Sequence, residues 1–212
     1  MTRVELTYAF DAYCGWCYGF APALHGFVAA NADRIQLRVL SGGLFSGAAA
    51  GPIGNYPHIP AANERIAGLT GVAFGAPYQR MLTEGTTVMD STAAATGLVA
   101  LRRQAPERAV EFAAAIQNAW YLQGRDLRDA AVYRSIALEH DLDVDAVTQA
   151  YAHPAVRAEA QEDFRALRRL GVSQYPTLLA HTATGVHRLG GPVASAEALT
   201  AALDAHLAPA AS

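Results

Sequence analysis

Residues 6–20 read LTYAFDAYCGWCYGF and contain the only two cysteines of the 212-residue chain, Cys14 and Cys17. An apolar segment with the composition of a strand, residues 4–10, comes before the pair. A helical pattern of apolar residues follows, namely Cys17, Phe20, Ala21, Leu24 and Val28. The sequence therefore predicts a strand that delivers two thiols to the first turn of a helix.

The spacing of Cys14 and Cys17 suits a disulfide that opens and closes. Residues three apart on a helix have Cα atoms roughly 5 Å apart, and disulfides need about 4.4–6.8 Å. Unpaired N–H groups and the helix dipole stabilise a thiolate at the amino end of a helix, where cysteine pKa values fall to about 3.5–7.5. We expect Cys14 to be the exposed attacking thiolate and Cys17 to be the thiol that resolves the mixed disulfide.

Two other interpretations of the cysteine pair are weaker. A zinc site with His25 as a third ligand lacks a second cysteine pair, and structural zinc sites usually have four Cys or His ligands. An inert disulfide would close too short a loop to restrict the unfolded chain. The sequence favours a redox-active pair, and we expect no metal site.

The composition narrows the class of protein. The chain is 52% hydrophobic and 17% charged, which suffices for one large domain or for a domain with an insertion. A net charge of −3 does not suggest nucleic acid or an anionic membrane as a partner. The first residues lack a signal-peptide pattern, and no apolar run reaches the roughly 18 residues of a membrane span. We therefore expect a cytoplasmic protein, and in that compartment a lone cysteine pair is more often catalytic than structural.

The order of elements along the chain has three parts. Residues 3–10, 14–30 and 35–40 read as strand, helix and strand, a unit whose two strands are parallel. Residues 41–60 are rich in glycine and proline, so we expect no regular element there but a rim or lid beside the thiols. Helical periodicity then runs through residues 61–170, with helices predicted at 64–69, 77–82, 91–104, 106–122, 129–140, 143–152 and 154–170.

The last part of the chain returns to strand chemistry. Residues 177–180 and 186–189 are predicted to pair as a hairpin around a turn at residues 182–185. Ser195 is predicted to begin a final amphipathic helix.

This layout resembles the DsbA-like thiol–disulfide oxidoreductases. The residues that carry the resemblance are CGWC at 14–17, Pro22, and the YPT at 175–177. The resemblance implies an α/β thioredoxin fold, a central mixed β-sheet with flanking helices, interrupted by an all-helical insertion. The thioredoxin-like domain would comprise residues 1–60 and 171–212, and the insertion residues 61–170. It also implies that Pro176 follows a cis peptide bond and lies against the cysteine pair.

Further stretches are similar to one branch, the predicted cytosolic disulfide isomerases of bacteria (FrnE-like). They lie at residues 10–11, 17–20, 41–44 and 69–75. Residues 123–127 resemble a loop of the DsbA-like and 2-hydroxychromene-2-carboxylate isomerase-like relatives. The sequence departs from the pattern at Tyr8, where thioredoxins and DsbA have a buried acid, and at Ala12, where many DsbA-like sequences have proline.

The leading hypothesis is thiol–disulfide exchange on protein or peptide substrates, with a cellular thiol reductant or oxidant as electron partner. Cys14 and Cys17 are the predicted catalytic residues. Tyr175 and Pro176 would align an extended substrate through backbone groups. Trp16 would contribute to an apolar docking surface, together with Leu44 and Phe45. No cofactor is expected beyond the cysteine pair.

Two alternatives stay open. The first is a glutathione-dependent isomerase or transferase of the kappa or 2-hydroxychromene-2-carboxylate isomerase type. Gly42 and Gly43 would then help to cradle glutathione, which is also a possible co-substrate in the leading hypothesis. The second is a peptide-binding module in which the disulfide acts as a redox switch.

Overall fold

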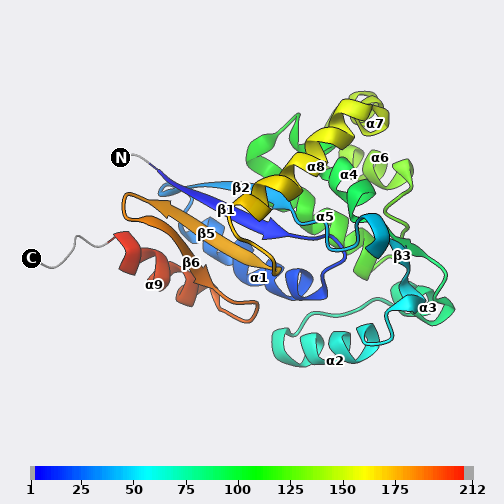
Figure 1. Cartoon of the computed structure of the whole chain (residues 1–212), viewed down its shortest axis with the longest axis horizontal. Helices are drawn as coiled ribbons and strands as arrows, with labels where there is room; N and C mark the ends of the chain where they lie inside the picture. The colour runs from blue at the N-terminus through cyan, green and yellow to red at the C-terminus, as the bar shows by residue number, and fades with distance from the viewer. Residues whose placement is uncertain (1–2, 208–212) are drawn as a thin grey trace, which may run out of the picture.

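The structure is a computed structural model that describes residues 3–207. A mixed four-stranded sheet has the order β2-β1-β5-β6 (Figure 1). β1 pairs in parallel with β2, and the pairs β1–β5 and β5–β6 are antiparallel. The bounds are β1 (Val4–Phe10), β2 (Ile35–Ser41), β5 (Thr177–Thr182) and β6 (Gly185–Gly190). The predicted βαβ unit and the hairpin are therefore confirmed.

Helices cover both faces of this sheet, because successive side chains of a strand point to opposite faces. Leu6, Tyr8 and Phe10 of β1 join one buried cluster with α1 (Gly15–Ala30) and α9 (Ala196–Leu207). Ala9 points the other way and packs with Leu167 of α8 (Pro154–Arg169). In Figure 1, α8 lies over the sheet on the side away from α1 and α9. β1 is thus a central strand with both faces covered.

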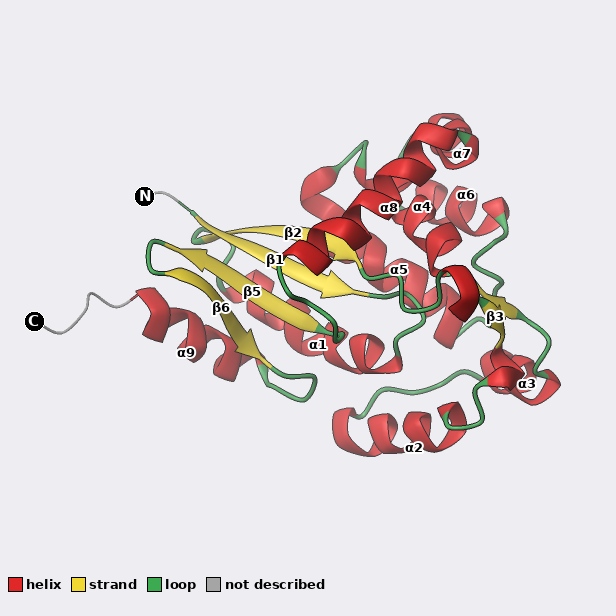
Figure 2. Cartoon of the chain, in the orientation of Figure 1, coloured by secondary structure: helices red, strands yellow, loops and turns green. Residues whose placement is uncertain are grey.

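Seven helices lie between β2 and β5 (Figure 2). Asp90, Asp129 and Asp143 accept backbone N–H groups at three of their amino ends, as expected of N-cap residues. The helices are α2 (Ile59–Thr70), α3 (Ala76–Glu84), α4 (Ser91–Arg102), α5 (Ala109–Tyr121), α6 (Ala130–Glu139), α7 (Val144–Ala152) and α8.

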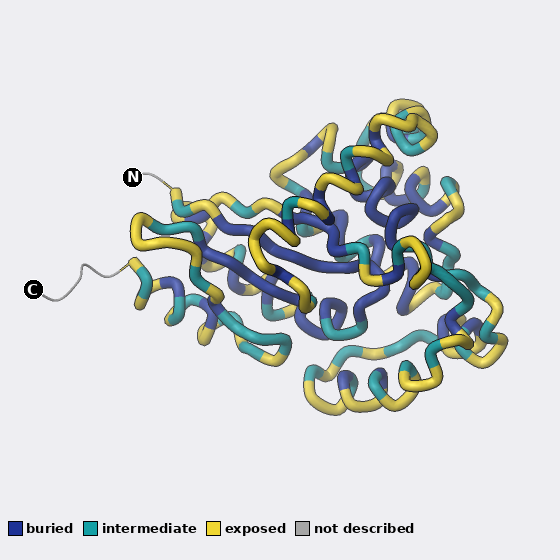
Figure 3. Tube along the Cα trace, in the orientation of Figure 1, coloured by how far each residue is buried: buried dark blue, intermediate teal, exposed yellow. Residues whose placement is uncertain are grey.

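The helical region shares its core with the sheet. Buried side chains of α4 and α5 belong to the same cluster as those of β1 and α1. Figure 3 shows α4 and the central strands as continuous buried trace, whereas the outer side of α2 is exposed. The division into two domains stays a prediction.

Residues 41–60 differ from the prediction that they hold no regular element. They contain β3 (Gly51–Pro52) and the 3₁₀ turns η1 (Gly47–Ala49) and η2 (Ile53–Asn55). β3 pairs with β4 (Val88–Met89). The prediction was wrong because the pairing partner lies more than thirty residues away, and local composition carries no signal for such a contact.

No helix within residues 3–207 is long and apolar enough to cross a lipid bilayer.

Candidate functional site

The two cysteines lie at the junction between β1 and α1. The carbonyl of Asp11, directly after β1, accepts the N–H of Cys14 at 3.1 Å. Cys14 has extended backbone angles and is the N-cap of α1. Its carbonyl accepts the N–H groups of Cys17 at 3.0 Å and Tyr18 at 3.1 Å. Both thiols are free, and the predicted strand–thiol–helix order is confirmed.

The segment before β5 brings a backbone carbonyl to the first thiol. The Tyr175–Pro176 peptide bond is cis. The thiol of Cys14 donates to the carbonyl oxygen of Tyr175 at 3.4 Å, across 161 positions of sequence. Pro176 therefore lies against the cysteine pair, as the resemblance implied.

The prediction that Cys14 is exposed is wrong. Only 7% of Cys14 and none of Cys17 is accessible to solvent. The carbonyl of Tyr175 lies directly on the Cys14 thiol, at 3.4 Å. On the next residue, a Cβ atom at Gly15 would lie 2.8 Å from Cδ1 of Ile66, so the glycine between the cysteines lets α2 pack on the first turn of α1.

The environment of Cys17 favours a neutral thiol. Burial raises its pKa most, the neighbouring Cys14 raises it further, and a hydrogen bond with the backbone of Asp11 opposes the shift. The hydroxyl of Tyr8 is buried and has no hydrogen-bond partner within residues 3–207. Burial is the largest cause that raises the pKa of Tyr8, and the neighbouring Cys17 and Cys14 raise it further. Tyr8 thus places an uncharged hydroxyl on the first strand, where the related folds have an acid.

The Asp11 carboxylate connects the loop before α1 with the loop after β2. It accepts the N–H of Tyr13 at 3.0 Å and the N–H of Leu44 at 2.8 Å. Only 1% of Asp11 is exposed, and this burial raises the pKa of its carboxyl group despite the backbone donors. Local sequence pattern does not predict these contacts of Asp11; the signal for a buried role is an acidic residue directly after an apolar strand.

Two aromatic rings pack directly on the backbone of Gly42 and Gly43. A Cβ atom at Gly42 would lie 2.2 Å from the Tyr175 ring, and one at Gly43 would lie 2.7 Å from the Phe164 ring. The hydroxyl of Tyr175 donates to the carbonyl of Gly42 at 2.9 Å. The structure gives both glycines a packing role, and their predicted contact with substrate stays a prediction.

The apolar surface near the thiols is smaller than expected. Trp16 is half-buried, with the guanidinium of Arg65 5.9 Å from its ring centroid. Leu44 is 43% exposed. Phe45 is buried between Tyr13 and Tyr56, so its prediction as a docking residue is wrong. Trp16 and Leu44 are the members of this surface that solvent can reach.

The site does not gather a metal-binding set. Within residues 3–207, no group of three or more His, Cys, Asp or Glu side chains could hold an ion. His25, the third ligand of the alternative zinc interpretation, lines a separate cavity of about 280 Å³ with Pro22 and Asn118.

Residues 5–191 match the family model of the DSBA-like thioredoxin domain. The chain belongs to this DsbA-like family, and the predicted fold class is confirmed.

Among solved structures, the cytosolic disulfide reductase DsbM from Pseudomonas aeruginosa is 26% identical, with a TM-score of 0.80 over 96% of this chain and 98% of that one. A putative protein disulfide isomerase from Nitrosomonas europaea is 21% identical, with a TM-score of 0.83 over 97% and 98% of the two chains. A 2-hydroxychromene-2-carboxylate isomerase is 13% identical, with a TM-score of 0.64 over 95% and 93%. The last two similarities concern the fold alone. A comparison with curated protein sequences finds no match.

Proposed function

We propose that this protein catalyses thiol–disulfide exchange through Cys14 and Cys17. The observation that carries the proposal is the contact of the Cys14 thiol with the carbonyl of Tyr175, next to the cis bond of Pro176. It is supported by the family and by the position of Cys14 as the N-cap of α1.

The reaction transfers two electrons. The Cys14 thiolate attacks a substrate disulfide, forms a mixed disulfide and displaces one substrate thiolate. Cys17 then loses its proton and attacks the sulfur of Cys14, which releases the second substrate thiolate and leaves the protein oxidised. Because Cys17 is fully buried and holds its proton, its deprotonation belongs to the second step.

Tyr175 has a positioning role in this proposal. Its carbonyl already binds the Cys14 thiol, and its ring is held by Gly42 through packing and the hydroxyl contact. An extended substrate that lies along residues 175–176 would bring its disulfide to the same side of Cys14.

We further propose the reducing direction, a cytoplasmic location and glutathione as the electron donor. The 26% identical relative DsbM is a cytosolic disulfide reductase, and a second structure of that protein contains GSH, at 27% identity and a TM-score of 0.78. The oxidised Cys14–Cys17 pair would take up two electrons as two glutathione molecules form one glutathione disulfide.

Reduction of insulin disulfides, driven by glutathione and followed by precipitation of the released chain, tests this proposal. Cys14→Ser is expected to lower the rate to the uncatalysed background because no thiolate remains to attack. Mixed with insulin in the absence of glutathione, Cys17→Ala is expected to accumulate a mixed disulfide between Cys14 and an insulin chain, visible by mass spectrometry, because the resolving thiol is missing. A Cys14→Ser protein that reduces insulin at the wild-type rate contradicts the proposal.

A glutathione-dependent isomerase or transferase is a second candidate, favoured by the fold of the 2-hydroxychromene-2-carboxylate isomerase. Such an enzyme would not need a second thiol. The second cysteine therefore supports the exchange reaction over this candidate.

A further inference from the structure

Two mostly buried side chains leave an oxygen free beside Gly15, the residue that follows the first thiol. A Cβ atom at Gly15 would lie 3.4 Å from Oδ1 of Asn63 and 3.8 Å from the hydroxyl oxygen of Tyr121. Asn63 belongs to α2, and Tyr121 is the last residue of α5. Only 8% of Asn63 and 2% of Tyr121 is exposed, and neither of these oxygens forms a hydrogen bond within residues 3–207.

The packing around both side chains holds these oxygens in place. Nδ2 of Asn63 donates to the hydroxyl of Tyr78 at 3.0 Å, which fixes the amide group and leaves Oδ1 as a free acceptor. The Tyr121 ring stacks on Tyr18, with ring centroids 4.7 Å apart. Phe74 and Tyr78 also pack against it, with centroids 5.5 and 5.2 Å away. Since a tyrosine hydroxyl lies on the long axis of its ring, this packed ring keeps the oxygen at one position.

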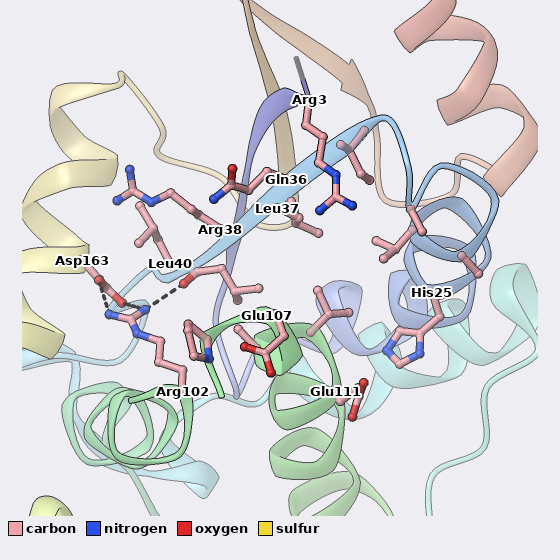
Figure 4. A pocket seen from close by; sticks show the side chains of 18 of the residues that line it. Arg3, His25, Gln36, Leu37, Arg38, Leu40, Arg102, Glu107, Glu111 and Asp163 are labelled. Atoms are coloured by element: carbon pink, nitrogen blue, oxygen red, sulfur yellow. Dashed lines mark hydrogen bonds and ion pairs between the residues drawn. The ribbon is translucent and has the colours of Figure 1, made fainter. Parts of the chain in front are cut away.

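Both oxygens can be reached from outside the protein. Within residues 3–207, the side-chain polar atoms that are sealed from solvent and lack a partner are the hydroxyls of Tyr8 and Tyr13. The free oxygens of Asn63 and Tyr121 are not among them. They also lie outside the groove of about 940 Å³ along β2, which Figure 4 shows and which contains neither cysteine. A ligand that bonds to them is therefore one that has reached the thiols.

The two oxygens together complement a peptide group. Oδ1 of Asn63 only accepts hydrogen bonds. The hydroxyl of Tyr121 donates, because burial raises its pKa and the proton stays on the oxygen. A peptide group offers one N–H donor and one carbonyl acceptor. A carboxylate, in contrast, would meet one donor and one oxygen that repels it.

A substrate bonded to Cys14 brings its backbone to this position. In a disulfide, the Cα atom of the substrate cysteine lies about 4.4–6.8 Å from that of Cys14. Gly15 is the next residue, with its Cα atom about 3.8 Å from that of Cys14. The peptide groups on either side of the substrate cysteine therefore come within reach of Asn63 and Tyr121.

We propose that Asn63 and Tyr121 bind a peptide group beside the reacting cysteine of the substrate, and that they select peptide thiols over thiols without an amide bond. The inference rests on the exchange reaction proposed above and adds the chemical class of thiol that the site selects. The two residues touch the backbone of the substrate, whereas the cysteines touch its sulfur.

Reduction of the oxidised protein by three thiols tests this selection. Glutathione has an amide bond on each side of its cysteine, 2-mercaptoethanol has none, and 3-mercaptopropionate has none but carries a carboxylate. Each thiolate attacks the sulfur of Cys14 and displaces the thiolate of Cys17, which takes up a proton, so that a mixed disulfide forms. Acid quenching followed by mass spectrometry measures the rate at which the oxidised protein disappears.

Tyr121→Phe removes the hydroxyl and keeps the ring. We expect its rate constant with glutathione to fall about two- to tenfold, as for the loss of one neutral hydrogen bond. Its rate constants with the two thiols that lack an amide should equal those of the wild type, which also shows that the site is folded. Asn63→Leu, which is close in shape, should have the same selective effect.

Tyr151→Phe is the matched control. The hydroxyl of Tyr151, in α7, donates to the carbonyl of Arg128 at 3.1 Å, away from the cysteine pair. Its loss should leave all three rate constants unchanged. Each variant is compared with the wild type for the same thiol, so differences in the reactivity of the thiols cancel.

The outcomes separate this inference from the proposed function. If Tyr121→Phe slows all three thiols equally, or slows none of them, the binding of a peptide group is refuted although the exchange reaction stands. If the oxidised wild type reacts with no thiol faster than an unfolded CGWC peptide disulfide does, the proposed function itself fails and this inference fails with it.

Discussion

Cys17 keeps its proton because the folded chain removes it from water. Burial is the largest cause of its raised pKa, and the nearby Cys14 acts in the same direction, while a hydrogen bond with the backbone of Asp11 opposes them. In the unfolded chain the same thiol ionises at about pH 8.5. A group that binds its proton more tightly in the folded state makes stability depend on pH.

The reduced protein is therefore expected to lose stability as the pH rises above about 8.5. The unfolded state releases the proton of Cys17 there while the folded state retains it, so the loss is absent below about pH 8 and reaches about 1.4 kcal/mol for each further pH unit. Urea unfolding between about pH 8 and 10 measures it, since tyrosines add the same trend only near pH 10 and above. Cys17→Ser should lack this slope; parallel curves for the two proteins would contradict the expectation.

The loop from Ser41 to Phe45 follows β2 and contacts residues on both sides of the cysteine site. Asp11 holds the N–H of Leu44, and Tyr175 packs on Gly42. Gly43 has a positive φ of 76°, which a glycine adopts without strain. The loop therefore positions Tyr175, whose carbonyl binds the Cys14 thiol.

Gly42→Ala is expected to destabilise the protein by about 1–3 kcal/mol, because the new Cβ would overlap the Tyr175 ring. The displaced ring should also lower the rate of insulin reduction. Gly68→Ala is the matched control. Gly68 lies in α2, and a Cβ atom added there would meet nothing within 4 Å, so alanine should stabilise the helix by about 0.5–1 kcal/mol. Thermal unfolding measures the stability of both variants. A Gly42→Ala protein of unchanged stability and activity would contradict the packing of the Tyr175 ring on Gly42.

At the scale of elements, local pattern predicted most helices and strands. The helices at residues 91–102 and 154–169 end within two residues of their predicted ends, and Asp129 and Asp143 cap helices as expected. Apolar periodicity and capping residues act over one or two helical turns, so the positions of helices can be predicted from the sequence. The β3–β4 pair was missed because its two strands meet only in the folded chain.

One ion pair joins the sheet, α4 and α8 across the whole molecule. The guanidinium of Arg102 donates to both carboxylate oxygens of Asp163, at 2.8 and 2.9 Å, and to the carbonyl of Val39. Only 6% of the Asp163 side chain is exposed, and burial raises the pKa of its carboxyl group although Arg102 opposes the shift. The Asp163 carboxylate accepts a third hydrogen bond, from the N–H of Ser41, which connects this pair to the loop beside the site.

Arg102→Met is expected to cost about 3–5 kcal/mol in the free energy of unfolding, because it leaves the Asp163 carboxylate buried without its partner. The deficit should shrink as the pH falls through the raised pKa of Asp163, since protonation removes the unpaired charge. Arg103→Met is the control. It breaks an exposed pair with Glu159 and should cost less than about 1 kcal/mol. Urea unfolding measures both variants, and equal losses would contradict the buried-pair assignment.

By itself, the sequence determined the thiol pair, its place between a strand and a helix, and the motif that led to the thioredoxin fold. These features depend on neighbours a few residues apart, where spacing and capping set the geometry. Only the tertiary structure decided how little of Cys14 is exposed, why Gly42 carries no side chain, and how β2 is joined to α4 and α8. Each of these depends on contacts between segments far apart in the chain, of Tyr175 with Cys14 and Gly42, and of Arg102 and Asp163 with β2. Such contacts form only when the chain packs, because burial and packing draw on all the elements together.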